Sequence, residues 1–247
     1  MSGRGFAEKV ALVTNGARGV GRAVALQLAF AGAYVIVNYR AEADAQIVDE
    51  LREMGTLAHA VAADTSQSEQ VVKLFDSVKD AFGRLDMLVN VAGTPEEVFL
   101  RDLSEAAWDE VMIRDLKSAF LCAQTALSLM KNRPSPGIVN VAAAAGVAGR
   151  FGGAHYAAAH AGIIGLTRAL ARELAPRVRV NCVAVGRVRE GQERGAASAP
   201  PGGDLASTQQ MGETLAADDE VARACLYLLS PEARFVTGQT MSVGSEW

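Results

Sequence analysis

Two segments of the chain carry residue types that could perform chemistry. In the first, an apolar run of strand length is followed by residues 14–21, Thr-Asn-Gly-Ala-Arg-Gly-Val-Gly, and then by a run of helix length. A glycine-rich turn between a strand and a helix presents backbone N–H groups and the positive helix end to a phosphate. In the second segment, Tyr156 is followed by His160. These two side chains could exchange protons with a substrate.

The elements that must position these residues follow a regular alternation. Apolar runs of strand length alternate with longer stretches of helical period, which is typical of βαβ units and a parallel sheet. We therefore expect one α/β domain, residues 1–247, with a Rossmann-type, doubly wound sheet of seven parallel strands in a three-layer α/β/α arrangement. The expected strands are residues 9–14, 33–38, 57–63, 86–91, 137–141, 178–183 and 239–243. The expected helices are residues 19–31, 42–54, 67–82, 104–131, 155–174 and 218–229.

Glycine and alanine mark the ends and connections of these elements. Gly32, Gly55 and Gly83 each follow a helix, where a left-handed backbone is expected. We expect an alanine-rich loop after the strand at 137–141. Residues 186–211 are rich in Gly, Ala, Ser and Pro and have no apolar period, so we expect a mobile substrate loop or lid there.

Composition excludes several classes of protein. Of the 247 residues, 50% are hydrophobic, which excludes a disordered chain. The formal charge of −4 argues against nucleic acid or an anionic membrane as the main partner. No run resembles a transmembrane span or a secretory leader. Cys122, Cys182 and Cys225 are odd in number and far apart, so we expect buried, reduced cysteines, no metal site and a cytoplasmic location.

Several motifs resemble the short-chain dehydrogenase/reductase family, and most closely its 3-oxoacyl-acyl-carrier-protein reductases. The glycine turn at 14–21 is similar to the family fingerprint TGxxxGxG. Asp64 follows the third expected strand, and residues 90–93 (Asn-Val-Ala-Gly) stand where the family has NNAG. Tyr156 lies in a YxxxK-like position, and residues 237–240 read TGQT. The resemblance extends over nearly the whole chain.

The resemblance implies a nicotinamide dinucleotide at the glycine turn. Asn15 replaces the first fingerprint glycine, and asparagine is the non-glycine residue that best tolerates a left-handed backbone. Arg18 and Arg40 could bind a 2′-phosphate, which favours NADP(H), with NAD(H) as the alternative; otherwise both arginines are solvated surface charges. By the same likeness Asp64 would receive the adenine amine, unless it is only a helix cap, and Asn90 would support the adenosine ribose region. The other cofactor-binding residues implied are Gly19, Val20, Gly21, Asn38, Tyr39, Thr65, Ala92, Gly93, Tyr156, His160, Gly186 and Val188.

The catalytic positions depart from the family pattern. The family uses a Tyr as general acid, a Lys that lowers the pKa of this Tyr, a Ser that polarises the carbonyl and an Asn that organises a water. Here Tyr156 is retained, whereas His160, Ala143 and Asp115 stand at the Lys, Ser and Asn positions. Glu190 stands where the family has a Thr that binds the nicotinamide carboxamide.

These exchanges predict impaired ketone reduction. Tyr has an ordinary pKa of about 10, so proton exchange near neutral pH needs a nearby cation. His160 is a cation only when protonated, and Asp115 would favour that form. Because the family places these two positions on either side of one water, we hypothesise a relay of Tyr156, His160 and Asp115. The missing hydroxyl at Ala143 removes an oxyanion donor, which typically costs about 10²- to 10³-fold in rate. The alternative is relaxed constraint, with His160 and Asp115 as neutral replacements.

Three functions are compatible with these residues. The first is an NADP(H)-dependent oxidoreductase that acts on a small carbonyl compound or an acyl-carrier-bound substrate. The second is a catalytically inactive nucleotide-binding subunit that partners an active paralogue. The third is redox-neutral acid–base chemistry, such as dehydration, cyclisation or isomerisation. The resemblance also implies a homodimer or homotetramer built on the helices at 104–131 and 155–174. The side chains available to pack there are Trp108, Phe120, Leu121 and Leu127.

Overall fold

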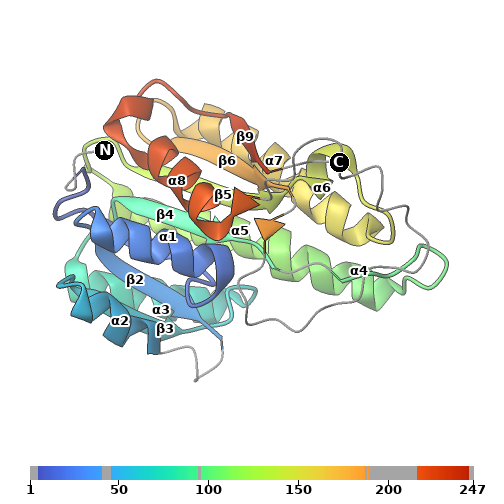
Figure 1. Ribbon diagram of the computed structural model, residues 1–247, viewed down its shortest axis with the longest axis horizontal. Coiled ribbons are helices and arrows are strands. Elements are labelled where there is room, and N and C mark those ends of the chain that lie inside the picture. The colour runs from blue at the N-terminus through green and yellow to red at the C-terminus, as the bar shows by residue number, and fades with distance from the viewer. Residues whose placement is uncertain (1–4, 41–45, 94–95, 187, 190–215, 245–247) are drawn as a thin grey trace.

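A parallel sheet forms the middle layer of the protein (Figure 1). The computed structural model describes residues 5–40, 46–93, 96–186, 188–189 and 216–244. The sheet has seven strands in the order β3-β2-β1-β4-β5-β6-β9, and every neighbouring pair is parallel. The strands are β1 Val10–Val13, β2 Tyr34–Tyr39, β3 Ala58–Ala62, β4 Met87–Val91, β5 Gly137–Ala143, β6 Arg179–Val185 and β9 Thr240–Val243. This confirms the expected doubly wound sheet, whose strand order reverses between β1 and β4.

Helices cover both faces of the sheet, as Figure 1 shows. One face carries α1 Gly19–Phe30, α2 Ile47–Glu53 and α8 Asp218–Leu229. The opposite face carries α3 Ser68–Phe82, α5 Ser118–Met130 and α7 Ala154–Leu174. The three-layer arrangement predicted from the alternation of strands and helices is therefore confirmed.

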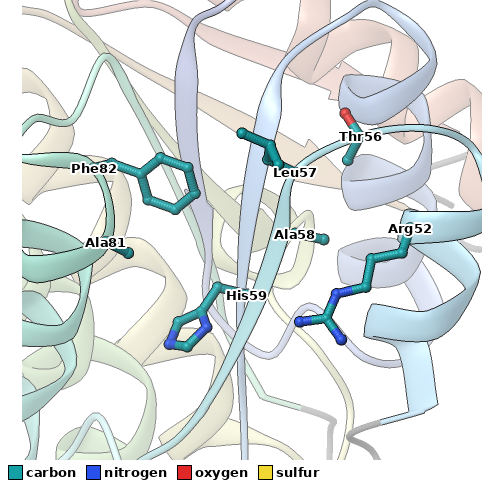
Figure 2. Close-up of a pocket in the computed structure, with 7 residues that line it drawn as sticks. All are labelled: Arg52, Thr56, Leu57, Ala58, His59, Ala81 and Phe82. Carbon is teal, nitrogen blue, oxygen red and sulfur yellow. The ribbon is translucent and has the colours of Figure 1, made fainter.

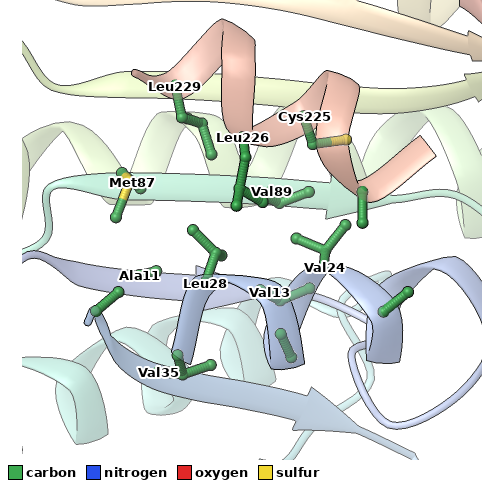
Figure 3. Packing of buried hydrophobic residues seen from close by; sticks show 14 of the residues in the cluster. Ala11, Val13, Val24, Leu28, Val35, Met87, Val89, Cys225, Leu226 and Leu229 are labelled. Atoms are coloured by element: carbon green, nitrogen blue, oxygen red, sulfur yellow. The ribbon is translucent and has the colours of Figure 1, made fainter. Parts of the chain in front are cut away.

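Successive side chains of a strand point to opposite faces of the sheet, so the buried residues form one hydrophobic cluster on each face. Ala11 and Val13 of β1 belong to the cluster beneath α1 and α8, whereas Val10 and Leu12 pack toward α3 and α5. Figure 3 shows Leu28 of α1 and side chains of α8 meeting above β1 and β4. Each large aliphatic side chain buried in this way contributes about 1.5–3 kcal/mol.

The helix predicted at 104–131 is divided into three segments. It runs as α4 Glu105–Val111, a π-helical segment η2 Met112–Lys117, and α5 Ser118–Met130. Apolar periodicity does not reveal a π-helical segment, because the register changes within an unbroken helix. Segments of this kind occur frequently at functional sites, and η2 contains Asp115.

Other expectations need small corrections. The alanine-rich segment after β5 is not only a loop, because it forms the short helix α6 Ala145–Ala148. The helix expected at 42–54 is described from Ile47, and residues 41–45 lie outside the described part. Two short strands, β7 Val188–Arg189 and β8 Ala216–Ala217, pair in parallel with each other and were not predicted. Most of the lid expected at 186–211 lies outside the described residues.

Two local expectations, on the helix-ending glycines and on the cysteines, are confirmed. Gly32, Gly55 and Gly83 adopt positive φ angles after their helices. All three cysteines are buried and free. Within the described ranges, no helix is long and apolar enough to cross a membrane.

Candidate functional site

The residues expected to form the site follow the carboxyl ends of neighbouring parallel strands, where an open α/β sheet binds its ligands. The glycine turn follows β1, Arg40 follows β2, Asp64 follows β3 and Gly93 follows β4. Ala143 is the last residue of β5. The topology therefore brings the predicted cofactor and catalytic residues to one edge of the sheet.

Asn15 forms the turn in the backbone conformation that its replacement of a glycine requires. Its φ is 47°, within the left-handed region. Its side-chain amide donates to the carbonyl of Val91 at 2.7 Å, so it also ties the turn to the end of β4. Asparagine at this position therefore keeps the turn and adds a contact that glycine could not make.

The start of α1 has no side-chain cap, and Oδ2 of Asp218 would lie 3.8 Å from a Cβ on Gly19. Its first residue, Gly19, follows Arg18, and neither a side-chain cap nor an acidic residue in the first turn accepts its leading N–H groups. Gly21 lies against the turn, since a Cβ there would come within 2.2 Å of the carbonyl oxygen of Asn15. Val20 is partly exposed between these glycines. Bare backbone donors at a helix N-terminus suit a diphosphate, so these residues fit a dinucleotide cofactor.

Arg40 and Asp64 bind each other. Nη2 of Arg40 donates to Oδ2 of Asp64 at 3.1 Å, and the second carboxylate oxygen accepts from the N–H and the hydroxyl of Ser66. Burial raises the pKa of Asp64, but the bonds from Ser66 and the charge of Arg40 outweigh it, so the pKa lies below its ordinary value. Any 2′-phosphate at Arg40 would share the guanidinium with this carboxylate. Arg40 remains exposed, whereas Thr65 beside the pair is buried.

Two predicted cofactor residues have buried side chains that join strands. Nδ2 of Asn38 donates to the carbonyl of Ala63 at 2.9 Å, and Nδ2 of Asn90 donates to Oδ1 of Asn140 at 2.9 Å. Asn140 in turn donates to the hydroxyl of Thr167 on α7. These contacts position the strand ends, and any contact of the two amides with a cofactor stays a prediction.

The remaining predicted cofactor residues lie along the same strand ends. Tyr39 is partly exposed at the end of β2, and the N–H of Ala92 donates to the carbonyl of Val141. The N–H of Gly186 donates to the carbonyl of Val243. The backbone of Val188 pairs with β8, while Glu190 lies outside the described residues.

Asp115 is fully buried, and both of its carboxylate oxygens accept hydrogen bonds. Its Oδ1 accepts from the N–H of Gly93 at 3.1 Å and from Nε of Arg114 at 2.9 Å. Its Oδ2 accepts from Nη2 of Arg114 at 3.3 Å. Burial raises the pKa of this carboxyl, but His160 and Arg114 together hold the pKa below its ordinary value. Asp115 is therefore a carboxylate near neutral pH.

His160 joins the two positions where the family has its Ser and Asn. Its Nδ1 accepts the backbone N–H of Ala143 at 2.8 Å, and its Nε2 lies 3.5 Å from Oδ2 of Asp115. The ring is 1% exposed. Because Nδ1 is an acceptor, the proton of the neutral ring lies on Nε2, facing the carboxylate. A second proton on Nδ1 would oppose the N–H of Ala143.

Tyr156 lies beside His160, with ring centroids 4.0 Å apart. It is 5% exposed. Burial and the charge of Asp115 raise the pKa of Tyr156 to about 12, and the opposing effects of Arg150 and Arg114 do not compensate. The structure thus places Tyr156 beside His160 and His160 beside Asp115, and the relay among them stays a prediction.

Sequence reasoning missed two arginines beside this group. Arg114 neutralises Asp115 and also contacts Glu96 at 3.2 Å. Arg150 lies over the Tyr156 ring. The adjacency of Arg114 to Asp115 is only a weak sequence signal for a site residue. Arg150 carried a stronger signal, because it is the one Asp, Glu, Lys or Arg residue between residues 134 and 167.

A pocket lies elsewhere, at the edge strand β3 (Figure 2). Its volume is about 440 Å³. Figure 2 shows Arg52 extending toward it from α2 and Phe82 from the end of α3. None of the predicted site residues lines it; the lining residues are Arg52, Thr56, Leu57, Ala58, His59, Ala81 and Phe82. Among the described residues, no group of three or more His, Cys, Asp or Glu is placed to hold a metal ion.

Comparisons with known proteins agree with the motifs. The family model described as enoyl-(acyl carrier protein) reductase matches residues 16–245. The 3-oxoacyl-(acyl-carrier-protein) reductase of Staphylococcus aureus is 37% identical over 239 residues, 95% of this chain and 96% of that protein. The chain belongs to the short-chain dehydrogenase/reductase family.

Further relatives of this short-chain dehydrogenase/reductase support the same assignment. The corresponding 3-oxoacyl reductase of Vibrio cholerae is 36% identical over 236 residues, 95% of each chain. The crystal structure of a dehydrogenase/reductase from Sinorhizobium meliloti superimposes with a TM-score of 0.85 at 31% identity, covering 96% of this chain and 94% of that one. These relatives confirm the family and its fold, and the roles of individual site residues stay predictions.

Proposed function

We propose that the protein is an NADP(H)-dependent oxidoreductase of the short-chain dehydrogenase/reductase type that acts on a carbonyl or acyl substrate, with impaired standard ketone reduction. The uncapped start of α1, the closely packed Gly21 and the 3-oxoacyl reductases among its relatives support this proposal. When bound, the cofactor would donate or accept a hydride. The chain itself must bind the carbonyl compound and move its proton.

The observation that carries the proposal is the bond between His160 and Ala143. In the family, the Ser and Lys positions both face the reacting centre. Here the backbone N–H at one position donates to the imidazole at the other at 2.8 Å. The N–H of residue 143 and Nδ1 of residue 160 are therefore hydrogen-bonded to each other. Residue 143 lacks the hydroxyl of the family pattern, and residue 160 lacks its permanent cation.

The remaining acid is poorly matched to ketone reduction near neutral pH. Tyr156, with its pKa of about 12, can donate a proton, but the phenolate that remains has no adjacent lysine to stabilise it. Loss of one oxyanion donor at residue 143 typically costs about 10²- to 10³-fold in rate. Asp115 adds negative charge near the same oxygen, which opposes a phenolate further.

Arg18 and Arg40 support NADP(H) as the cofactor. Arg40 is exposed at the end of β2, and Arg18 is exposed at the start of α1. A guanidinium binds a phosphate through two parallel hydrogen bonds. Because Arg40 also binds Asp64, we expect a preference for NADPH over NADH, moderated by this carboxylate.

The test begins with fluorescence titration of NADPH and NADH, followed by turnover with ketones, enones and acyl thioesters. We expect NADPH to bind more tightly and wild-type turnover to be slow. The double variant Ala143→Ser with His160→Lys keeps Asp115 as a partner for the new cation and should raise ketone reduction by about 10²- to 10³-fold. Adding Tyr156→Phe should abolish that gain. The proposal is refuted if neither NADPH nor NADH binds.

A second candidate function is an inactive nucleotide-binding subunit of an assembly. Trp108 on α4 is 37% exposed and Phe120 on α5 is 41% exposed, which leaves apolar surface for a partner. Leu121 and Leu127, expected on the same surface, are partly buried against the core on the α3 and α5 face. Co-purification with an active reductase whose rate falls when this chain is omitted would favour this candidate. A homogeneous homodimer or homotetramer with its own turnover would favour the first.

A further inference from the structure

The loop that follows α6 is held firmly beside Tyr156. The N–H of Val98 donates to the carbonyl of Gly152 at 2.8 Å, and Val98 forms a parallel bridge with Gly153. Gly149 and Gly152 have φ angles of 84° and 62°, conformations that L side chains rarely adopt. The loop therefore has a defined course over residues 149–153.

This course directs Arg150 toward the tyrosine. The side chain folds back over Gly153, where a Cβ would come within 2.9 Å of Cδ of Arg150. Its Cζ lies 5.9 Å from the centroid of the Tyr156 ring, within the range of a cation–π contact. The glycine at 153 thus makes room for the stem of the arginine.

Arg150 differs from the other arginine at the site. Arg114 is occupied by Asp115 and Glu96. Arg150 is exposed, and no ion pair of Arg150 occurs among the residues that the structure describes. A guanidinium with several unused N–H donors is suited to a carboxylate, which it binds through two parallel hydrogen bonds.

We infer that Arg150 binds a carboxylate of the substrate, and that the substrate class is therefore a short oxo acid rather than a neutral ketone. This inference rests on the proposed function, in which Tyr156 faces the substrate carbonyl. Because Cζ of Arg150 lies 5.9 Å from the centroid of the Tyr156 ring, we expect a ligand that reaches both side chains to carry its carboxylate and carbonyl only a few bonds apart. A 2-oxo or 3-oxo acid meets this requirement.

The surroundings of Arg150 add a second contact for such a substrate. Phe151 meets Phe99 edge to face, with ring centroids 5.1 Å apart, and both rings are exposed. An alkyl group attached to the oxo acid could cover these rings. Glu97, whose side chain lies over Gly152, would repel an anion that Arg150 does not neutralise, so the arginine decides whether a carboxylate is accepted.

The test compares acetoacetate with acetoacetamide, which have similar size and the same ketone but differ in charge. Binding is measured by calorimetry, without turnover, to the protein alone and to the protein loaded with NADPH. A charge-assisted hydrogen-bonded pair predicts that the wild type binds acetoacetate about 10- to 100-fold more tightly than the amide. Arg150→Gln should remove this preference, whereas Arg150→Lys should keep part of it.

Arg101→Gln is the matched control. Arg101 also lies over an aromatic ring, at 5.8 Å from the centroid of Phe99, but it is paired with Asp102. This variant should keep the preference of the wild type. Equal affinity of the wild type for the two probes, no binding of either, or a preference that survives Arg150→Gln would overturn the inference. Intact NADPH binding in those cases leaves the proposed function standing, whereas a charge preference without NADPH binding would refute the proposed function alone.

Discussion

The contact between Asp115 and His160 predicts the effect of one isosteric substitution. Asp115→Asn keeps the shape of the side chain and one carbonyl oxygen, which can still accept from Gly93 and Arg114. The new NH₂ group then faces Nε2 of His160, which carries a proton because Nδ1 accepts from Ala143. Two donors oppose each other. The ring can avoid this by moving its proton to Nδ1, but then the N–H of Ala143 loses its acceptor.

In the first outcome the buried Nε2, which in the wild type faces the carboxylate at 3.5 Å without a hydrogen bond, faces a donor instead; in the second the N–H of Ala143 loses its acceptor. Either outcome costs about 1–3 kcal/mol. Arg114 also loses its buried partner, but it is 19% exposed and keeps Glu96, so this loss is smaller than for a fully buried pair. We expect Asp115→Asn to lower the free energy of unfolding by about 2–4 kcal/mol. Urea denaturation followed by circular dichroism, at one fixed protein concentration, measures this difference.

The pH dependence has a defined sign. The pKa of Asp115 is lower in the folded protein than its ordinary value, so its stabilisation is complete above the unfolded value of about 3.9. It is lost as the pH falls through the lower folded value. The difference between wild type and Asp115→Asn should therefore be constant between about pH 5 and 8 and should shrink below about pH 4.

Glu96→Gln is the control for this prediction, because it removes the other carboxylate of Arg114. Glu96 is 61% exposed, and a surface pair of this kind contributes up to about 1 kcal/mol. The reasoning is refuted if Asp115→Asn costs no more than Glu96→Gln. It is also refuted if the ¹⁵N chemical shifts of the wild-type His160 ring place the neutral proton on Nδ1.

Three further predictions test other parts of the site and fold. Gly21→Ala places a Cβ 2.2 Å from the carbonyl oxygen of Asn15, an overlap that typically costs about 1–3 kcal/mol; it should weaken NADPH binding in a fluorescence titration, whereas Gly165→Ala, with open space around it, should not. The absorbance titration of wild type minus Tyr156→Phe should show its step near a pKa of about 12, and a step at or below 10 would contradict the burial argument. Arg179 is buried and donates to the last carbonyls of α8, so Arg179→Gln should lower the free energy of unfolding by about 3 kcal/mol; a loss below about 1 kcal/mol in urea denaturation would show that the helix end is satisfied otherwise.

The fold could be predicted almost completely, because its signals are local. Alternating runs of strand and helix length specify βαβ units, and parallel units allow few arrangements. The π-helical segment at 112–117 was not predictable, since it changes hydrogen-bond register without changing composition. The short helix at 145–148 was missed because four small residues carry almost no periodic signal.

The sequence predicted which candidate residues lie near one another but not the hydrogen bonds that they make. Positions in the family motifs placed Tyr156, His160 and Asp115 together, and the structure agrees. His160 was expected to act as a cation only when protonated, and its role stays a prediction. The contact that the sequence did not suggest is the N–H of Ala143, which donates to Nδ1 of His160. That backbone contact depends on how β5 meets α7, which no single-residue pattern reports.

The replacements at residues 115, 143 and 160, which together form the floor of the site, are better explained as one arrangement than as independent changes. A lysine at residue 160 would bring a charge to the floor of the site, where Asp115 is fully buried. With histidine there, the carboxylate needs another cation, and Arg114 supplies it at 2.9 Å. With alanine at residue 143, the strand end presents only its N–H, and the imidazole accepts it. Each change satisfies a polar group that another change exposes.

The floor of the site is then balanced in charge, and the cation that faces Tyr156 is Arg150 at the exposed rim. This account predicts that the wild-type site selects its ligand by charge at Arg150, and that the double variant Ala143→Ser with His160→Lys gains ketone reduction without losing that selection. Gain of ketone reduction accompanied by loss of the preference for acetoacetate would show that the floor and the rim are not separate, and the account would fail.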